Sequence, residues 1–255
     1  MTALIGLESI LSLALVFAVA LLAGFVKGCV GFAMPTVMMS GLTLLLPPEQ
    51  ALAALIIPTL LTNTWQALRQ GVRSAWQTVI RFRVFLAAGC VCLVASAQLV
   101  PVLNARALFG LIGGPILLFA CAQLAGWRPV LGSRSSRVEA AVGGFTGLIG
   151  GVSGIWGPPT VSYLTAINVP KQDSVRAQGT IYGLGAVALA GAHIQTGVLR
   201  PDTLPLSLFL IPAALIGLAI GFRVQDKFDQ ATFRRATLLV LIVAGLNLLR
   251  RAVFG

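Results

Sequence analysis

The sequence has few charged side chains and very few acidic ones. Of its 255 residues 10% are charged, and only seven are Asp or Glu, whereas soluble domains carry about 25% charged residues. Fifty-seven per cent are hydrophobic, and stretches such as 207–222 and 236–249 are almost continuously apolar. Because these stretches do not alternate between apolar and polar residues, they favour membrane-spanning α-helices over β-strands. A nucleic-acid partner is excluded, since no basic run carries interleaved aromatic residues.

Groups that hold metals or form disulfides are also scarce. The four cysteines lie inside apolar stretches and form no CxxC pair, so neither a disulfide nor a metal site is expected, and no cofactor is predicted. No Asp or Glu falls in the middle of an apolar stretch, which argues against a carboxylate proton relay. His193 is the only histidine. It is therefore a candidate for proton coupling, because histidine titrates near neutral pH.

The net charge of +11 comes from Lys and Arg residues in short loops between apolar stretches, for example the predicted basic loop 69–83. Such loops orient a multi-pass protein with its basic side in the cytoplasm. We therefore expect the lipid bilayer of the cell (inner or plasma) membrane as the surroundings. A homodimer stays open.

What the sequence has in excess is glycine and proline at two places. The stretch 144–159 reads GFTGLIGGVSGIWGPP, and the stretch 24–35 reads GFVKGCVGFAMP. Both residue types weaken helices, and in a membrane an interrupted helix is tolerated only where protein buries it or where it lines a wet cavity. We predict a broken helix in each stretch. Gly24 and Gly147, which precede the breaks, are predicted to be close-packing residues.

The two stretches belong to a repeat. An offset of 123 residues relates Gly24 to Gly147 and Pro35 to Pro158, and the matched order continues through each half with small insertions. The halves, 1–127 and 128–255, have five predicted segments each, and this odd number gives them opposite orientations. The fold class is thus an all-α polytopic membrane protein with two inverted five-segment repeats. About ten transmembrane or partly spanning helices are expected, with discontinuous helices at the start of each half.

Inverted repeats with interrupted helices are typical of secondary transporters, whose site lies near the middle of the membrane. The N-terminus of each half-helix presents free N–H groups and the positive end of the helix dipole, which favours an anion. We therefore predict a transporter of small anions that works by alternating access, and not an enzyme.

At these residues the chain resembles the sulfite exporter TauE/SafE family of membrane permeases, best over 144–180. The resemblance implies transport of sulfite, of sulfonates such as sulfoacetate, or of small carboxylates. Family members often have a glycine run before the proline of each half, and here Phe32-Ala33-Met34 and Trp156-Gly157-Pro158 replace it. The second stretch keeps more polar character, so we expect the anion there and a hinge in the first stretch.

The candidate residues follow from this division. The predicted substrate-binding residues of the second stretch are Gly151, Ser153, Gly154, Trp156, Gly157 and Pro158. The predicted polar wall consists of Asn63, Gln66, Gln178 and Tyr182, with Arg176 as a fork for a sulfonate or carboxylate. The predicted hinge comprises Lys27, Gly28, Gly31 and Pro35. A lysine inside a membrane is a functional candidate unless its side chain reaches the interface.

Two other classes remain open. Ser153 lies in a G-x-S-G sequence and His193 on a later segment, which is the outline of a rhomboid-like serine protease dyad. A channel or a structural membrane subunit would need no inverted halves.

Overall fold

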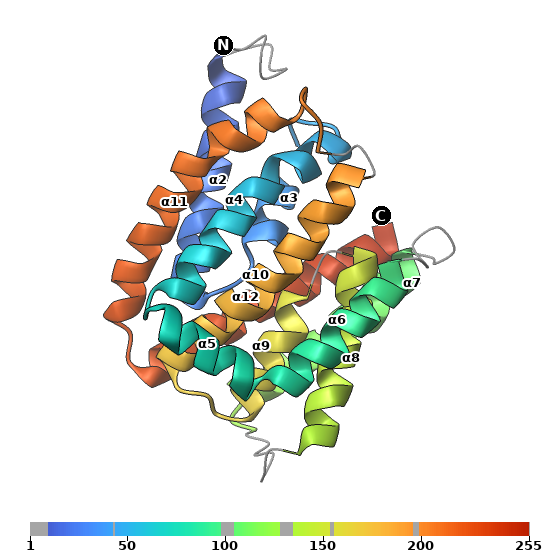
Figure 1. Cartoon of the computed structure of the whole chain (residues 1–255), viewed down its shortest axis with the longest axis vertical. Coiled ribbons are helices and arrows are strands. Elements are labelled where there is room, and N and C mark those ends of the chain that lie inside the picture. The colour runs from blue at the N-terminus through green and yellow to red at the C-terminus, as the bar shows by residue number, and fades with distance from the viewer. Residues whose placement is uncertain are drawn as a thin grey trace.

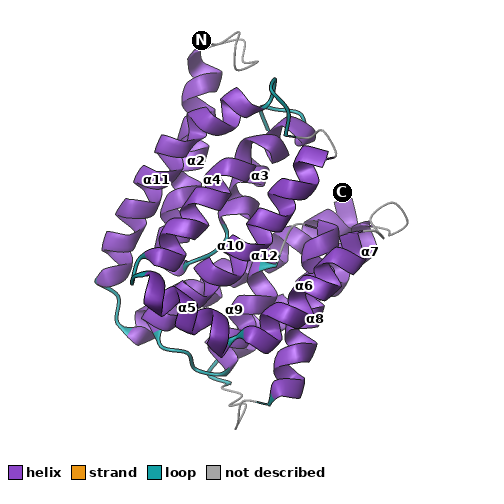
Figure 2. Cartoon of the chain, in the orientation of Figure 1, coloured by secondary structure: helices purple, strands orange, loops and turns teal. Residues whose placement is uncertain are grey.

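The computed structural model describes residues 10–42, 44–97, 105–127, 135–153, 156–195 and 199–254. All regular secondary structure in these residues is helical (Figure 2). The described helices are α2 (Ile10–Val30), α3 (Met34–Leu42), α4 (Pro48–Leu68), α5 (Val72–Arg81), α6 (Arg83–Ala97), α7 (Ala105–Leu124), α8 (Ser136–Ser153), α9 (Gly157–Ala166), α10 (Lys171–Gln195), α11 (Leu204–Asp226) and α12 (Gln230–Phe254).

Four of the described helices are long and apolar enough to cross a membrane: α2, residues 50–68 of α4, α11 and α12. A fifth span results if α5 and α6, which meet at a bend of 75°, are taken together. The all-α membrane class is therefore confirmed, whereas ten spanning or partly spanning segments stay a prediction.

Helix α5 corrects the predicted basic loop 69–83. Its apolar side chains Val72, Trp76 and Ile80 repeat every four residues, so they share one face of the helix, and all three are exposed. An amphipathic helix with exposed apolar and basic residues is typical of one that lies in the membrane interface. The arginines of this segment therefore belong to a helix and to its flanks, and not to an irregular loop.

The helices pack into two bundles (Figure 1). In the first bundle, α2, α3, α4 and α11 share one apolar core. In the second bundle, another core joins α6, α7, α8, α9, α10 and α12, and it also takes in Val30 of α2 with Phe32 and Ala33 after it. Helix α10 packs along α4, so it connects the two bundles (Figure 1). Each bundle mixes helices from both sequence halves, because α11 comes from the second half and α6 and α7 come from the first.

Close backbone contacts hold two helix pairs together. A Cβ added at Gly24 of α2 would lie 2.2 Å from the carbonyl oxygen of Ala214 in α11. A Cβ added at Gly147 of α8 would lie 2.0 Å from the carbonyl oxygen of Gly89 in α6. Only glycine allows helices to approach so closely, which is a common device in membrane proteins. The prediction that Gly24 and Gly147 are packing residues is confirmed.

Helix α2 ends at Val30, and α3 begins at Met34. We call the intervening residues 31–33 the first break. Gly31 and Ala33 there have φ of 90° and 74°, a left-handed conformation that costs energy in a residue with a Cβ such as Ala33. The second break separates Ser153, the last residue of α8, from Gly157, the first of α9; of its residues 154–156, the structure describes Trp156.

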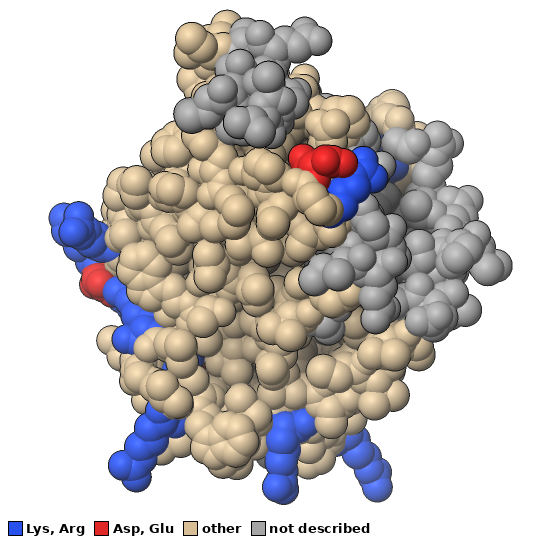
Figure 3. Space-filling view, turned by 45° about the horizontal axis from the view of Figure 1, so that its top comes forward, with Lys and Arg blue, Asp and Glu red and all other residues tan. Residues whose placement is uncertain are grey.

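The surface matches a protein surrounded by lipid. Large apolar side chains such as Leu22, Val91, Leu118 and Val243 are exposed in the middle of long helices. Figure 3 shows Lys and Arg side chains extending from the margins of a broad uncharged surface. The chain is an integral membrane protein, and its apolar exposed side chains face the hydrocarbon.

Candidate functional site

A small cavity lies between the two bundles, where both breaks meet. Its volume is ≈ 30 Å³, which is room for about two water molecules. The residues that line it are Lys27, Phe32, Ala33, Met34, Pro35, Thr36, Thr59, Asn63, Trp156, Gly157, Pro158 and Tyr182. The first bundle supplies the wall from α2, α3 and α4, and the second bundle supplies the wall from the second break, α9 and α10.

Lys27 is the charged residue of this cavity. It lies in the last turn of α2 and is only 1% exposed, so its side chain does not reach an aqueous interface. Its Nζ donates to Oγ1 of Thr62 at 3.1 Å and to Oδ1 of Asn63, both on α4. These acceptors are neutral, and among the described residues no carboxylate contacts Lys27. A buried charge that lacks an opposite charge is costly in a membrane protein and marks a functional position.

Pro58 shapes the part of α4 that receives Lys27. Proline has no N–H, so the carbonyl of Ala54 loses its partner in the helix. Ser207 of α11 replaces that partner, with its Oγ donating to the Ala54 oxygen at 3.2 Å. Thr62 donates to the Pro58 oxygen at 2.7 Å, which leaves the Thr62 oxygen free to accept from Lys27.

Asn63 and Thr59 have polar atoms that find no partner. Oδ1 of Asn63 accepts from Lys27, whereas its Nδ2 is buried and unpaired, as is Oγ1 of Thr59. Buried polar atoms of this kind are rare unless a ligand or water completes them. An ammonium, an amide N–H and a hydroxyl around one cavity are donors, and donors suit an anion.

The second-break side of the cavity is mostly apolar. Trp156 packs against α8 and α10, because a Cβ added at Gly150 or Gly185 would lie 2.7 or 3.0 Å from its indole ring. Tyr182 donates its hydroxyl to the Gly157 oxygen at 3.1 Å. Helix α9 begins Gly-Pro-Pro, and prolines have no N–H. The expected row of free N–H groups at this helix start is therefore reduced, which corrects the prediction made for it.

Gln66 and Gln178 do not line this cavity and lie beside the first break instead. Nε2 of Gln66 donates to the oxygens of Gly31 (2.9 Å) and Val175 (2.7 Å), so both of its N–H groups are used. Oε1 of Gln178 lies 2.6 Å from where a Cβ of Gly31 would be. The atoms that remain unpaired, Oε1 of both glutamines, accept hydrogen bonds and do not donate them.

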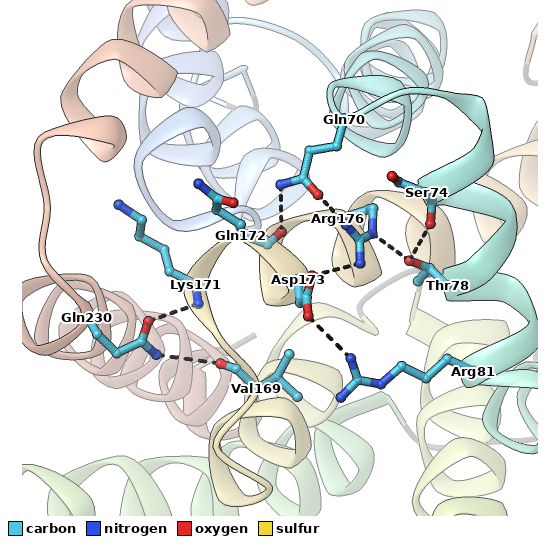
Figure 4. A network of polar contacts seen from close by, with 10 residues as sticks. All are labelled: Gln70, Ser74, Thr78, Arg81, Val169, Lys171, Gln172, Asp173, Arg176 and Gln230. Carbon is cyan, nitrogen blue, oxygen red and sulfur yellow. Dashed lines mark hydrogen bonds and ion pairs between the residues drawn. The ribbon is translucent and has the colours of Figure 1, made fainter.

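Arg176 lies in a polar network at the start of α10 (Figure 4). It donates to Oγ1 of Thr78 and to Oδ1 of Asp173, each at 2.7 Å, and to Oε1 of Gln70. Arg81 forms an ion pair with the other oxygen of Asp173 at 3.3 Å. The network joins α10 to α5 and to the turn after α4, and it does not border the cavity. The predicted role of Arg176 in anion binding stays a prediction.

The network adjoins a larger cavity of ≈ 490 Å³ near the α9–α10 turn. Ser174, Asn168 and Arg234 are among the residues that line it. Ser174 also accepts a hydrogen bond from Nε2 of Gln178 at 3.2 Å. Polar groups therefore lead from this cavity through Ser174 and Gln178 to Gly31.

The remaining predicted residues divide into two sets. Pro35 lines the cavity, and Gly28 packs against α11, where an added Cβ would lie 2.7 Å from Cα of Gly221. The side chains of Ser153 and His193 lie outside the described residues, as do all of Gly154 and the surroundings of Gly151. The proposed Ser153–His193 dyad therefore has no described geometry.

The sequence reasoning placed Thr59 with Asn63 and Gln66 on one polar face of α4, and Thr59 lines the cavity. It missed other residues of the site: Thr62, which follows Pro58 on α4 and accepts from Lys27, was recognisable only as a polar residue of that helix. Phe32 and Thr36 carried no signal beyond their place near the break. Within the described residues, no group of three or more His, Cys, Asp or Glu side chains is placed to hold a metal ion.

Comparison with known proteins gives one family match. The family model described as Sulfite exporter TauE/SafE matches residues 16–248, a range that includes both breaks and every residue of the cavity between the bundles. No curated protein and no solved structure matches the chain.

Proposed function

Because the chain belongs to the sulfite exporter TauE/SafE family, whose members are membrane transporters of sulfite-type anions, we propose that it carries a small anion through the Lys27 cavity. The substrate is sulfite, a short sulfonate or a small carboxylate. The protein works as a multi-pass secondary transporter of the cell membrane.

The buried amino group of Lys27 is the observation that carries this proposal. Together with Nδ2 of Asn63 and Oγ1 of Thr59 it forms a set of donors with free capacity. The three oxygens of a sulfite or sulfonate group accept hydrogen bonds, and an ionised acceptor bonds more strongly than a neutral one. The α3 N-terminus adds the positive end of its dipole, because Met34 and Thr36 border the same cavity.

The positions that line the cavity support the inverted repeat. Four pairs of lining residues are related by the offset of 123 found in the sequence: Ala33 and Trp156, Met34 and Gly157, Pro35 and Pro158, Thr59 and Tyr182. Residues related by a pseudo-two-fold axis meet at one place only if that place lies on the axis. Such a position, between two repeats and beside broken helices, is typical of the substrate site in secondary transporters.

The packing supports alternating access. The cavity lies between the two bundles, each of which has its own apolar core. We expect a rocking motion of one bundle against the other, with α10 and α4 at their contact. With a volume of ≈ 30 Å³, the cavity has room for about two waters, so an organic sulfonate enters only when the bundles move apart.

The other functional classes have less support. The family match is to transporters, which is consistent with a protein that is not an enzyme. The rhomboid-like alternative would require Ser153 and His193 to meet, and the family match gives no support to a protease. A channel would not need inverted halves.

Uptake by proteoliposomes of the purified full chain tests the proposal, with sulfite, ethanesulfonate and acetate compared. Lys27→Met is expected to lower anion uptake at least tenfold, because it removes the positive charge from the site. Asn63→Ala removes a hydrogen bond to an ionised group, worth ~1.5–3 kcal/mol, and so is expected to raise KM by about tenfold or more.

Lys227→Met is the matched control, since it makes the same substitution at an exposed lysine after α11. Thr64→Ala controls for Asn63→Ala, because the neighbouring Thr64 is exposed and bonds only within α4. Wild-type uptake by folded Lys27→Met protein would disprove the proposed site. Failure of the wild type to move any of the three anions would disprove the proposed substrates.

A further inference from the structure

Lys27 carries the one charge at the cavity, and no described group balances it. The groups that face it from α4 are Thr59, Thr62 and Asn63, all neutral. From the second bundle the titratable group at the cavity is the Tyr182 phenol, which donates to a carbonyl oxygen. Two described carboxylates, Asp173 and Asp226, form ion pairs with arginines that do not line the cavity.

The occupancy of such a site is linked to its protonation. A lysine ammonium without a counter-ion is costly to bury, and an anion in the cavity removes that cost. Anion binding therefore favours the proton on Lys27, and by reciprocity the proton favours the anion. When the anion leaves, the ammonium again has no counter-ion, and loss of its proton removes the cost of a buried charge.

The hydrogen bonds of Lys27 allow this change without a further penalty. An ammonium has three donors, and two of them are used by Thr62 and Asn63. After the third proton leaves, the neutral amine keeps both hydrogen bonds, and its lone pair accepts from water in the cavity. Neither protonation state leaves Thr62 or Asn63 without its partner.

We propose that Lys27 binds the coupling proton of this transporter, so that one proton crosses the membrane with each monovalent anion. The proposal rests on the proposed function. A proton from water on the uptake side forms an N–H bond with the Lys27 amine, and the anion then binds the ammonium. After the bundles move, the anion leaves and the proton returns to water on the other side. The loaded and the empty sites are both neutral, so transport moves no net charge.

Ethanesulfonate is a suitable probe because it stays ionised and cannot carry the proton itself. Proteoliposomes contain a trapped pH-sensitive dye, and labelled ethanesulfonate is added outside. The wild type is expected to acidify the lumen by one proton per anion taken up. Its uptake should rise with an inward proton gradient and should not change when the membrane potential is clamped at different values.

Lys27→Arg separates charge from protonation, because a guanidinium keeps its proton in proteins. This variant is expected to exchange internal for external ethanesulfonate. Its net uptake needs the empty transporter to change orientation, and an empty site with a permanent charge makes that step slow. Its net uptake and its lumenal acidification should fall at least tenfold. His193→Gln, at the other candidate proton carrier, is expected to keep the wild-type proton-to-anion ratio.

Ethanesulfonate uptake by the wild type without acidification would overturn the proposal while leaving the anion transporter intact. Net proton-coupled uptake by Lys27→Arg, or loss of acidification in His193→Gln, would also overturn it. If Lys27→Arg does not fold, the proton-to-anion ratio of the wild type alone decides. No transport of any anion by the wild type would instead refute the function on which the proposal rests.

Discussion

The two breaks come from one duplicated element, yet they bring different chemistry to the same cavity. The first break has the charged Lys27 beside it and a strained backbone at Ala33. The second break brings an indole ring and a helix start that is rich in proline. The described donors therefore gather on the first-break side, and the described part of the second-break side is a wall.

Sequence offsets show how this difference arises. The counterpart of Lys27 is Gly150, and the counterpart of Ala33 is Trp156. In the second half the indole fills the space next to Gly150, where an added Cβ would lie 2.7 Å from it. A large side chain at position 150 is thus excluded by Trp156. The first copy therefore has a long basic side chain at Lys27 and a small one at Ala33. The second copy has glycine at the position that matches Lys27 and a large ring at the position that matches Ala33.

The first prediction concerns what the two halves have in common. Gly24→Leu and Gly147→Leu are each expected to prevent folding, because the added side chain meets backbone oxygens at 2.2 and 2.0 Å, and overpacking of this kind costs at least ~1–3 kcal/mol. The measurement is the yield of monodisperse protein in detergent and its thermal unfolding.

Gly114→Leu in α7 is the control, since an added Cβ there has no atom within 4 Å. It should leave the yield unchanged. If only one of the two variants at Gly24 and Gly147 fails to fold, the packing of the halves is not equivalent and the comparison between the breaks loses its basis.

Several parts of this arrangement could be predicted from the sequence because their causes are local. Glycine and proline at 24–35 and 144–159 weaken a helix wherever it lies, so the first break could be placed closely. Gly24 and Gly147 were identified because close packing is the usual reason for glycine in a membrane helix. The fixed offset pointed to a shared site before any contact was known.

Other parts could not be predicted because their causes lie far away in the chain. Lys27 is held inside the protein by Asn63, which is 36 residues away in sequence, so the sequence could not decide whether the ammonium reaches the interface. Helix α5 was overlooked because its arginines resemble a loop, although Val72, Trp76 and Ile80 have helical spacing. The partner Thr78 of Arg176 is 98 residues distant.

The second prediction tests whether anion contacts extend beyond the first break. Arg176→Ala removes the hydrogen bonds to Thr78 and Gln70 and the ion pair with Asp173. Because these contacts join α10 to α5 and to the turn after α4, we expect a lower unfolding temperature and a change of a few-fold in the maximal transport rate. The KM for ethanesulfonate should stay within about twofold.

Arg73→Ala provides the comparison, since this arginine is exposed on α5. A rise of KM by tenfold or more in Arg176→Ala would place the guanidinium at the anion in another conformation of the transporter. The earlier sequence prediction for Arg176 would then be correct, and the polar side of the site would include the second half.

The last and smallest effect is expected at Tyr182, the counterpart of Thr59 on the second-break side. Tyr182→Phe removes a hydroxyl that donates to the Gly157 oxygen at 3.1 Å and keeps the ring that forms the wall. A neutral hydrogen bond contributes about 1 kcal/mol, so any rise of KM should stay below about fivefold.

Thr59→Val is the paired variant, because it removes the unpaired hydroxyl from the first-break side at the matching position. If the donors on the first-break side hold the anion, Thr59→Val raises KM more than Tyr182→Phe does. The reverse order would mean that the phenol leaves Gly157 to bind the anion. The second break would then be the ligand side, as its serine and tryptophan had suggested, and Lys27 would act on the proton alone.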